Sequence, residues 1–174
     1  MIPDLSNLFS RFGAEVVLAL AIPAILLADL LGRRKGATAT GFLALGTALL
    51  LVLLQGSDSG AILTKLLVAD GLAKVFRLLA ILTGLIAALA ALRWGDAERG
   101  RAELFVCLIG AVLGACLTAA ANDLAMLYIA IETLSIGGYL LAGFRKQSAL
   151  GSEAALKYVI FGAVSSGAML YGMS

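Results

Sequence analysis

Glu132 is the residue best placed to carry proton chemistry, because it lies in the middle of an apolar stretch from Leu124 to Phe144. On a helix it would lie about 12 Å and about 18 Å from the two ends of that stretch, so its carboxylate cannot reach the membrane surface. Inserting a carboxylate at such a depth costs on the order of 3 kcal/mol. Ionisable groups held there are usually functional. Glu132 is therefore a candidate for gaining and losing protons.

Three further polar side chains share the helix face of Glu132. Tyr128, Glu132, Ser135 and Tyr139 follow one another at spacings of four, three and four residues, which places all of them in one stripe. Such a stripe must face protein or water. Two interpretations stay open. The stripe supports a proton path, or it makes a hydrogen bond between helices that only holds a bundle together.

Lys157 is the second candidate and lies about one turn into an apolar stretch from Ala154 to Met173. Glu153 precedes it by one turn, and a Glu-to-Lys pair at this spacing on the rim of a membrane helix needs no function at all. The residues alone leave a proton carrier and a rim ion pair equally open.

Serines mark the start and one side of this last stretch. Ser152 stands where a helix cap is expected. Ser165 and Ser166 continue a weakly polar side, which is compatible with a hydrated face but not specific to one.

Other residue types exclude several kinds of site. The sequence contains no histidine, so imidazole proton relays and imidazole ligation of haem are excluded. Cys107 and Cys116 fall on roughly opposite sides of one helical stretch, from which neither a disulfide nor a metal site follows. We expect no metal site and no cofactor site in this chain. Glu15 and Arg77 lie near the ends of apolar stretches, where we expect them to anchor helices at the membrane interface.

Membrane-spanning helices must position these side chains. Charged residues make up 14% of the chain and hydrophobic residues 61%, whereas a soluble domain carries about 25% charged residues. An apolar run of about 20 residues can cross a bilayer. The qualifying stretches are Ala14–Leu31, Ala37–Leu54, Val75–Leu92, Leu104–Ala121, Leu124–Phe144 and Ala154–Met173. The sequence therefore predicts an all-α, polytopic transmembrane bundle with six spans.

The short loops predict the direction of these spans. Positive charge gathers in alternate loops, at Arg33, Arg34 and Lys35, at Arg93, Arg99 and Arg101, and at Arg145 and Lys146. Loops rich in Lys and Arg face the cytoplasm, so the N-terminus faces outward. The first apolar run is too long for a secretory signal and is expected to be retained. Residues 61–74 have partial amphipathic character, and we expect them to lie along the membrane surface before the third span begins.

Two runs of residues resemble a known family. The run from Asn122 to Phe144 resembles the fifth helix of the antiporter-like subunits of respiratory complex I. The run from Ser152 to Ser166 is similar to one branch of them, subunit N and its mitochondrial homologue NADH dehydrogenase subunit 2, more than to the longer subunits L and M. Weaker similarity is found at Asp29 and at residues 70–73.

The resemblance implies an antiporter-like fold built from inverted repeats of helices. This chain would supply its N-terminal part and end inside the first repeat, before helix seven. Residues 1–121 would form helices one to four, and residues 122–174 the incomplete start of the proton-translocating core. By resemblance, Glu132 matches the helix-five glutamate, which faces a lysine on helix seven in the family. Lys157 matches a helix-six lysine, and together they would form the proton relay.

The function implied is that of a membrane subunit of a proton-pumping NADH:quinone oxidoreductase, in which quinone reduction drives proton translocation through the relay. This chain would hold no redox centre, and NADH, flavin, iron–sulfur clusters and quinone would bind partner subunits. Its partners would be other membrane subunits of complex I, the hydrophilic arm indirectly, and lipid. The net charge of +2 gives no reason to expect nucleic acid. The expected location is the bacterial inner (plasma) membrane.

Three other functions fit the residues. A subunit of a sodium/proton antiporter or of a membrane-bound hydrogenase would share the same helical core. A self-contained six-helix transporter would use Glu132 as an ion or substrate site. Membrane scaffolding is the least compatible with a carboxylate at mid-bilayer depth.

Overall fold

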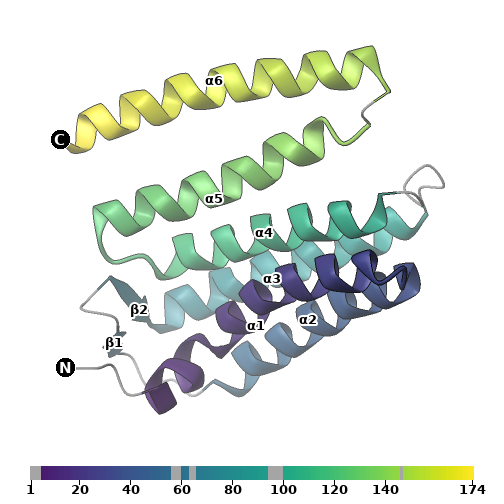
Figure 1. Ribbon diagram of the computed structural model, residues 1–174. Coiled ribbons are helices and arrows are strands. Elements are labelled where there is room, and N and C mark those ends of the chain that lie inside the picture. The colour runs from purple at the N-terminus through teal and green to yellow at the C-terminus, as the bar shows by residue number, and fades with distance from the viewer. Residues whose placement is uncertain (1–4, 56–59, 63–65, 94–99, 146) are drawn as a thin grey trace.

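The chain forms a bundle of helices that lie side by side (Figure 1). The computed structural model describes residues 5–55, 60–62, 66–93, 100–145 and 147–174. Its helices are α1 (Leu5–Leu30), α2 (Arg34–Leu54), α3 (Gly71–Leu92), α4 (Arg101–Ala120), α5 (Leu124–Ala142) and α6 (Ala149–Met173). Two short strands, β1 (Gly60–Ile62) and β2 (Leu67–Ala69), pair antiparallel between α2 and α3.

The predicted spans are confirmed. Within the described residues, six helices are long and apolar enough to cross a membrane. In the second half of the chain, the observed and predicted helix starts differ most for α6, which begins at Ala149, whereas the predicted span begins at Ala154. Its cap is Ser148, whose Oγ accepts a hydrogen bond from Gly151 N at 3.2 Å. The expected cap at Ser152 is therefore wrong, because a suitable side chain stands one turn earlier.

The segment 61–74 does not lie as a single amphipathic stretch, and that prediction is wrong where the structure describes it. Leu67 and Ala69 of β2 are buried, and Asn122 N donates to Leu66 O at 2.9 Å, so the strand pair is tied to the start of α5. The segment also contains the beginning of α3. Asp70 caps that helix by accepting from Ala73 N at 2.7 Å.

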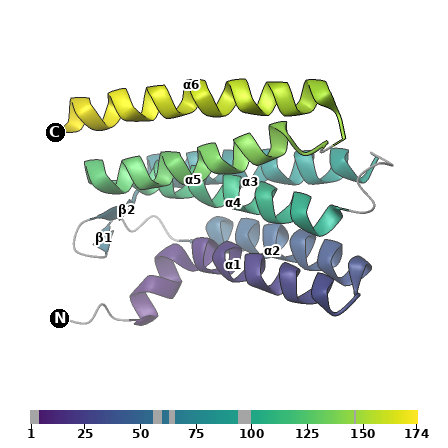
Figure 2. The ribbon, with the colours of Figure 1, turned by 45° about the horizontal axis from the view of Figure 1, so that its top comes forward.

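The links between helices divide between two ends of the bundle. The α1–α2 and α5–α6 links lie at one end, together with the end of α3 and the start of α4 (Figures 1 and 2). The strand pair, the α4–α5 link, the start of α1 and the end of α6 lie at the other end. The helix ends next to the loops rich in Lys and Arg thus share one end of the bundle.

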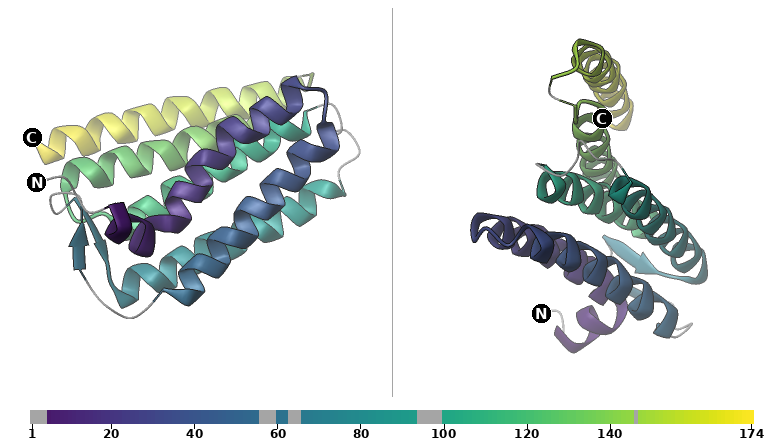
Figure 3. Two further views of the ribbon diagram at one scale, coloured as in Figure 1. Left: turned by 60° about the horizontal axis from the view of Figure 1, so that its bottom comes forward. Right: turned by 90° about the vertical axis from the view of Figure 1, so that its right-hand side faces the viewer.

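Helix α4 lies at the centre of the packing and contacts α1, α2, α3 and α5. Phe105 is buried in the core and meets the Phe42 ring edge-on, with ring centroids 5.3 Å apart. Viewed end-on, α5 and α6 extend outward from the other helices, and α6 is farthest from α1 (Figure 3, right). Every residue of α6 is described, and none is buried.

Arg77 joins the first three helices. Helix α1 breaks at Phe12, whose backbone angles (φ −124°, ψ 22°) are not helical. The Arg77 guanidinium reaches this break from α3: its Nη2 donates to Glu15 Oε2 at 2.6 Å and to Arg11 O at 3.2 Å. Its Nη1 donates to Gln55 Oε1 at the end of α2, at 2.9 Å.

Glu15 and Arg77 are therefore not the interfacial anchors that the sequence predicted. Their side chains are 6% and 1% exposed and form a buried ion pair. The anchor prediction considered only how deep each residue lies in the membrane, because a long charged side chain near a helix end can extend to water. Here each charge instead finds an opposite charge on a neighbouring helix.

Removing one partner of a buried ion pair leaves an unpaired buried charge, which costs about 3 to 5 kcal/mol. We therefore expect Glu15→Gln and Arg77→Met each to lower the free energy of unfolding by about 3 kcal/mol. The double variant should lose less than the sum of the two single losses. SDS-induced unfolding of the purified protein in detergent measures all three variants.

The matched control is Glu153→Gln, because Glu153 forms an ion pair whose side chains are 57% and 66% exposed. Exposed pairs contribute little, so this variant should unfold like the wild type. Additive losses in the Glu15 and Arg77 double variant would contradict a direct interaction between the two side chains.

Candidate functional site

The polar stripe of α5 faces α6. Tyr128, Glu132, Ser135 and Tyr139 are each half-buried. Ser166 Oγ of α6 donates a hydrogen bond to Glu132 Oε1. The glutamate thus lies at a contact between two membrane-spanning helices.

The opposite face of α5 fixes this orientation by packing closely on α4. A Cβ atom added at Gly137 would lie 2.8 Å from Ala111 Cβ and 3.0 Å from Ala111 N. One added at Gly114 of α4 would lie 2.8 Å from Leu134 Cα. Neither backbone can yield easily, so both positions require glycine. The small residues therefore bring one face of α5 against α4 and leave the polar stripe for α6.

Two tyrosines interlock α5 with α6. The rings of Tyr139 and Tyr158 meet edge-to-face, with centroids 4.9 Å apart and planes at 84°. A Cβ atom at Gly162 of α6 would overlap the Tyr139 hydroxyl. On the other side, a Cβ atom at Gly138 would lie 3.4 Å from the Tyr158 hydroxyl. Each ring therefore reaches across to a glycine of the facing helix.

Lys157 is not brought to Glu132. Its Nζ forms an ion pair with Glu153 Oε1 at 2.6 Å, and its side chain is 66% exposed. Lys157 and Ser166 are nine residues apart, about two and a half helical turns, so they project from opposite faces of α6. Since Ser166 faces α5, Lys157 points away from it. The Glu153–Lys157 pair has the geometry of the rim pair that the sequence left open.

Ser166 is the residue whose role sequence reasoning missed, because the serines were read only as a weakly polar side. The available signal was the spacing Tyr158, Gly162, Ser166, which repeats every four residues and so lies on one helix face.

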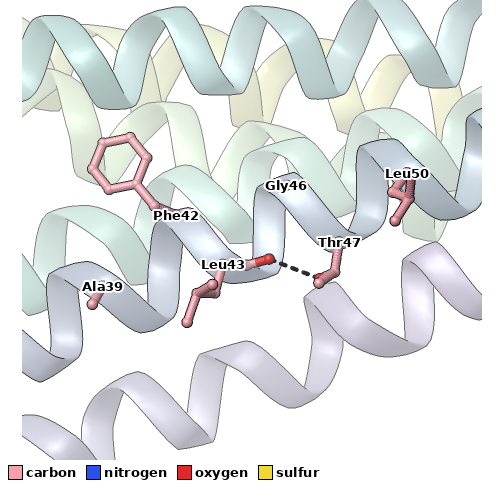
Figure 4. A pocket seen from close by; sticks show the side chains of 6 residues that line it. All are labelled: Ala39, Phe42, Leu43, Gly46, Thr47 and Leu50. Atoms are coloured by element: carbon pink, nitrogen blue, oxygen red, sulfur yellow. Dashed lines mark hydrogen bonds between the residues drawn. The ribbon is translucent and has the colours of Figure 1, made fainter.

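The other features of the described residues do not form a second centre of polar chemistry. No group of three His, Cys, Asp or Glu side chains that could hold a metal ion is found among them. A groove of about 560 Å³ runs along α2 (Figure 4). It is lined by Ala39, Phe42, Leu43, Gly46, Thr47 and Leu50. The Thr47 hydroxyl donates to Leu43 O at 2.8 Å, so the groove presents an apolar surface.

Comparisons with known proteins agree on one group of relatives. The family model described as NADH:quinone oxidoreductase/Mrp antiporter, TM, matches residues 121–174. NAD(P)H-quinone oxidoreductase subunit 2 of Gloeobacter violaceus is 36% identical over 166 residues, which cover 92% of this chain and 32% of that protein. NADH-quinone oxidoreductase subunit N of an Anaeromyxobacter species is 36% identical over 169 residues, covering 94% and 33%.

A solved structure shows the same fold. A chain of respiratory complex I from Thermus thermophilus, determined with bound aureothin, superposes with a TM-score of 0.79 and 32% sequence identity. The match covers 91% of this chain and 35% of that chain. This chain thus spans about a third of the length of the relatives it matches.

Proposed function

We propose that this chain, which aligns with about a third of the length of quinone oxidoreductase subunits N and 2, is a membrane subunit of a proton-pumping NADH:quinone oxidoreductase. Quinone reduction elsewhere in the complex would drive proton translocation through it. The observation that carries the proposal is Glu132, a half-buried carboxyl group on a membrane-spanning helix, held against the next helix by Ser166.

The proposed chemistry is electrostatic. A carboxyl group away from bulk water changes its preferred protonation state when a charge moves near it or when water enters its surroundings. Glu132 can take part in such a step because its stripe lies between α5 and α6, where a small separation of the helices would admit water. Glu15 is not suited to it, because Arg77 holds a permanent positive charge 2.6 Å away.

We propose Lys157 as the second member of the relay, on the strength of the family resemblance. Its position on the face of α6 away from Glu132 means that it would act on groups beyond the α5–α6 contact. Tyr128, Ser135 and Tyr139 would support the path along α5. The proposed division of the chain places the core at residues 122–174, and the family model that matches residues 121–174 supports it.

The partners proposed are the other membrane subunits of the complex and, indirectly, its hydrophilic arm. NADH, flavin, iron–sulfur clusters and quinone would be bound by those subunits. A cation/proton antiporter subunit is the second candidate, because the matching family model is described by both activities. The two differ in one consequence: only in the oxidoreductase should a change at Glu132 slow NADH oxidation.

We also propose that the protein lies in the bacterial inner membrane with its N-terminus outward, because the helix ends next to the loops rich in Lys and Arg share one end of the bundle. We expect an impermeant maleimide to label Gln147→Cys from the cytoplasmic side and Asn122→Cys from the outer side. Both positions are exposed. The parent chain with Cys107 and Cys116 replaced is the control, and labelling of both positions from one side would contradict this topology.

We expect Glu132→Gln to reduce both proton translocation and NADH-driven quinone reduction by at least about tenfold, because glutamine cannot ionise. Glutamine keeps the shape and still accepts a hydrogen bond, so the complex should assemble. Glu132→Asp keeps the charge and shortens the reach, so it should retain partial activity. Quinone reductase rate and the proton gradient are measured in vesicles, with abundance checked on native gels. Normal pumping by the Gln variant would show that Glu132 only packs.

Lys157→Ala separates the relay from the rim pair. If Lys157 carries protons, its removal should lower turnover more than Glu153→Ala does, while assembly stays normal. An exposed ion pair contributes at most about 1 kcal/mol, so a purely structural pair predicts equal and small effects of the two single variants and the double. The same vesicle assay compares all three.

A further inference from the structure

The hydroxyl group of Ser166 contacts Glu132 although α6 has no buried residue. The adjacent serine behaves differently. Ser165 Oγ donates to Phe161 O of its own helix at 2.9 Å and is exposed. Of these two neighbouring serines, one satisfies its hydroxyl locally and the other reaches across to the facing helix.

The tyrosine–glycine contacts and the Ser166–Glu132 hydrogen bond lie along the same pair of antiparallel helices. Tyr139 fits against Gly162, and Ser166 lies one turn beyond that glycine. On the antiparallel helix, Glu132 lies about two turns before Tyr139. A shift of α6 by one turn along α5 would bring Tyr158 or Ser166, which have Cβ atoms, to the place where the Tyr139 hydroxyl leaves room only for Gly162. It would also separate the Ser166 hydroxyl from the Glu132 carboxyl group. The register of the two helices therefore maintains this hydrogen bond.

A hydroxyl group suits a partner that changes its protonation state. It has one hydrogen to donate and two lone pairs that accept. When Glu132 is ionised, the Ser166 hydroxyl donates to the carboxylate. When Glu132 is protonated, the carboxyl O–H can donate to Ser166 Oγ after the hydroxyl rotates. A lysine or arginine partner could not accept in the second state.

We propose that Ser166 is a positioning residue for Glu132, which holds the carboxyl group at the α5–α6 contact in both of its protonation states. The carboxyl group can then gain and lose a proton without losing its hydrogen-bond partner. This inference rests on the proposed function, in which Glu132 exchanges protons.

The test replaces Ser166 in the assembled complex and measures quinone reductase rate, proton gradient and the pH profile of turnover in vesicles. Ser166→Ala should lower turnover about tenfold, the size expected for a lost hydrogen bond to an ionisable group. It should also change the pH profile, because Glu132 loses the partner that serves both states. Ser166→Thr keeps the hydroxyl and should restore rate and profile.

Two further variants make the test decisive. Ser165→Ala is the matched control and should behave like the wild type. Ser166→Cys keeps the size of the side chain but offers only a weak hydrogen-bond partner. It should assemble and turn over at a rate between wild type and Ala, so it tests the inference if the Ala variant fails to assemble.

Normal rate and pH profile in the Cys and Ala variants, beside an impaired Glu132→Gln, would overturn this inference and leave the proposed function standing. A loss of abundance that Thr does not restore, with an unchanged pH profile, would also overturn it, because Ser166 would then only pack. A normal Glu132→Gln variant would instead remove the proposed function itself.

Discussion

The arrangement of the first three helices depends on one guanidinium group. The Arg77 guanidinium donates hydrogen bonds to three groups: the Arg11 carbonyl next to the break in α1, the buried Glu15 carboxylate, and the Gln55 side chain at the end of α2. A buried polar group without a partner costs several kcal/mol, and a buried charge costs more. Arginine can reach all three groups because its donors point in several directions from one plane. Lys74, one turn earlier on α3, adds a hydrogen bond from its Nζ to Gln55 O at 2.5 Å.

Helix α4 connects these first three helices to the candidate site, because it packs against all three of them and against α5. The core formed by α1, α2 and α3 packs on α4, whose Phe105 and Cys116 are fully enclosed. Gly114 of α4 and Gly137 of α5 then let two backbones approach closely. Close contact through small residues is the main way in which helices associate in lipid, where apolar side chains gain little by leaving the solvent. The rotation of α5, and with it the direction of Glu132, is set by these glycines.

The two carboxyl groups within the spans have opposite surroundings. Glu15 forms a buried ion pair with Arg77, a cation that does not deprotonate, and this pair joins α1 to α3. Glu132 meets a hydroxyl group that can donate or accept a hydrogen bond. Two carboxyl groups in one protein can have different roles because their surroundings differ. The contrast suits Glu15 to structure and Glu132 to the proposed proton exchange.

The sequence by itself determined the six spans, the depth of Glu132 and the face it shares with Tyr128, Ser135 and Tyr139. Apolar length and helical spacing are local properties, so they can be read from the order of residues. The tertiary structure decided which side chains meet. Glu15 and Arg77 are 62 residues apart and Glu132 and Ser166 are 34 apart. Lys157 lies on the far face of α6. Residues 60–62 and 67–69 form paired strands, whereas the sequence predicted that residues 61–74 lie along the membrane surface. Residue spacing shows which side chains share one face of a helix, but it does not show which neighbouring helix that face contacts. That contact depends on where two helices approach closely, as they do at Gly114 and Gly162.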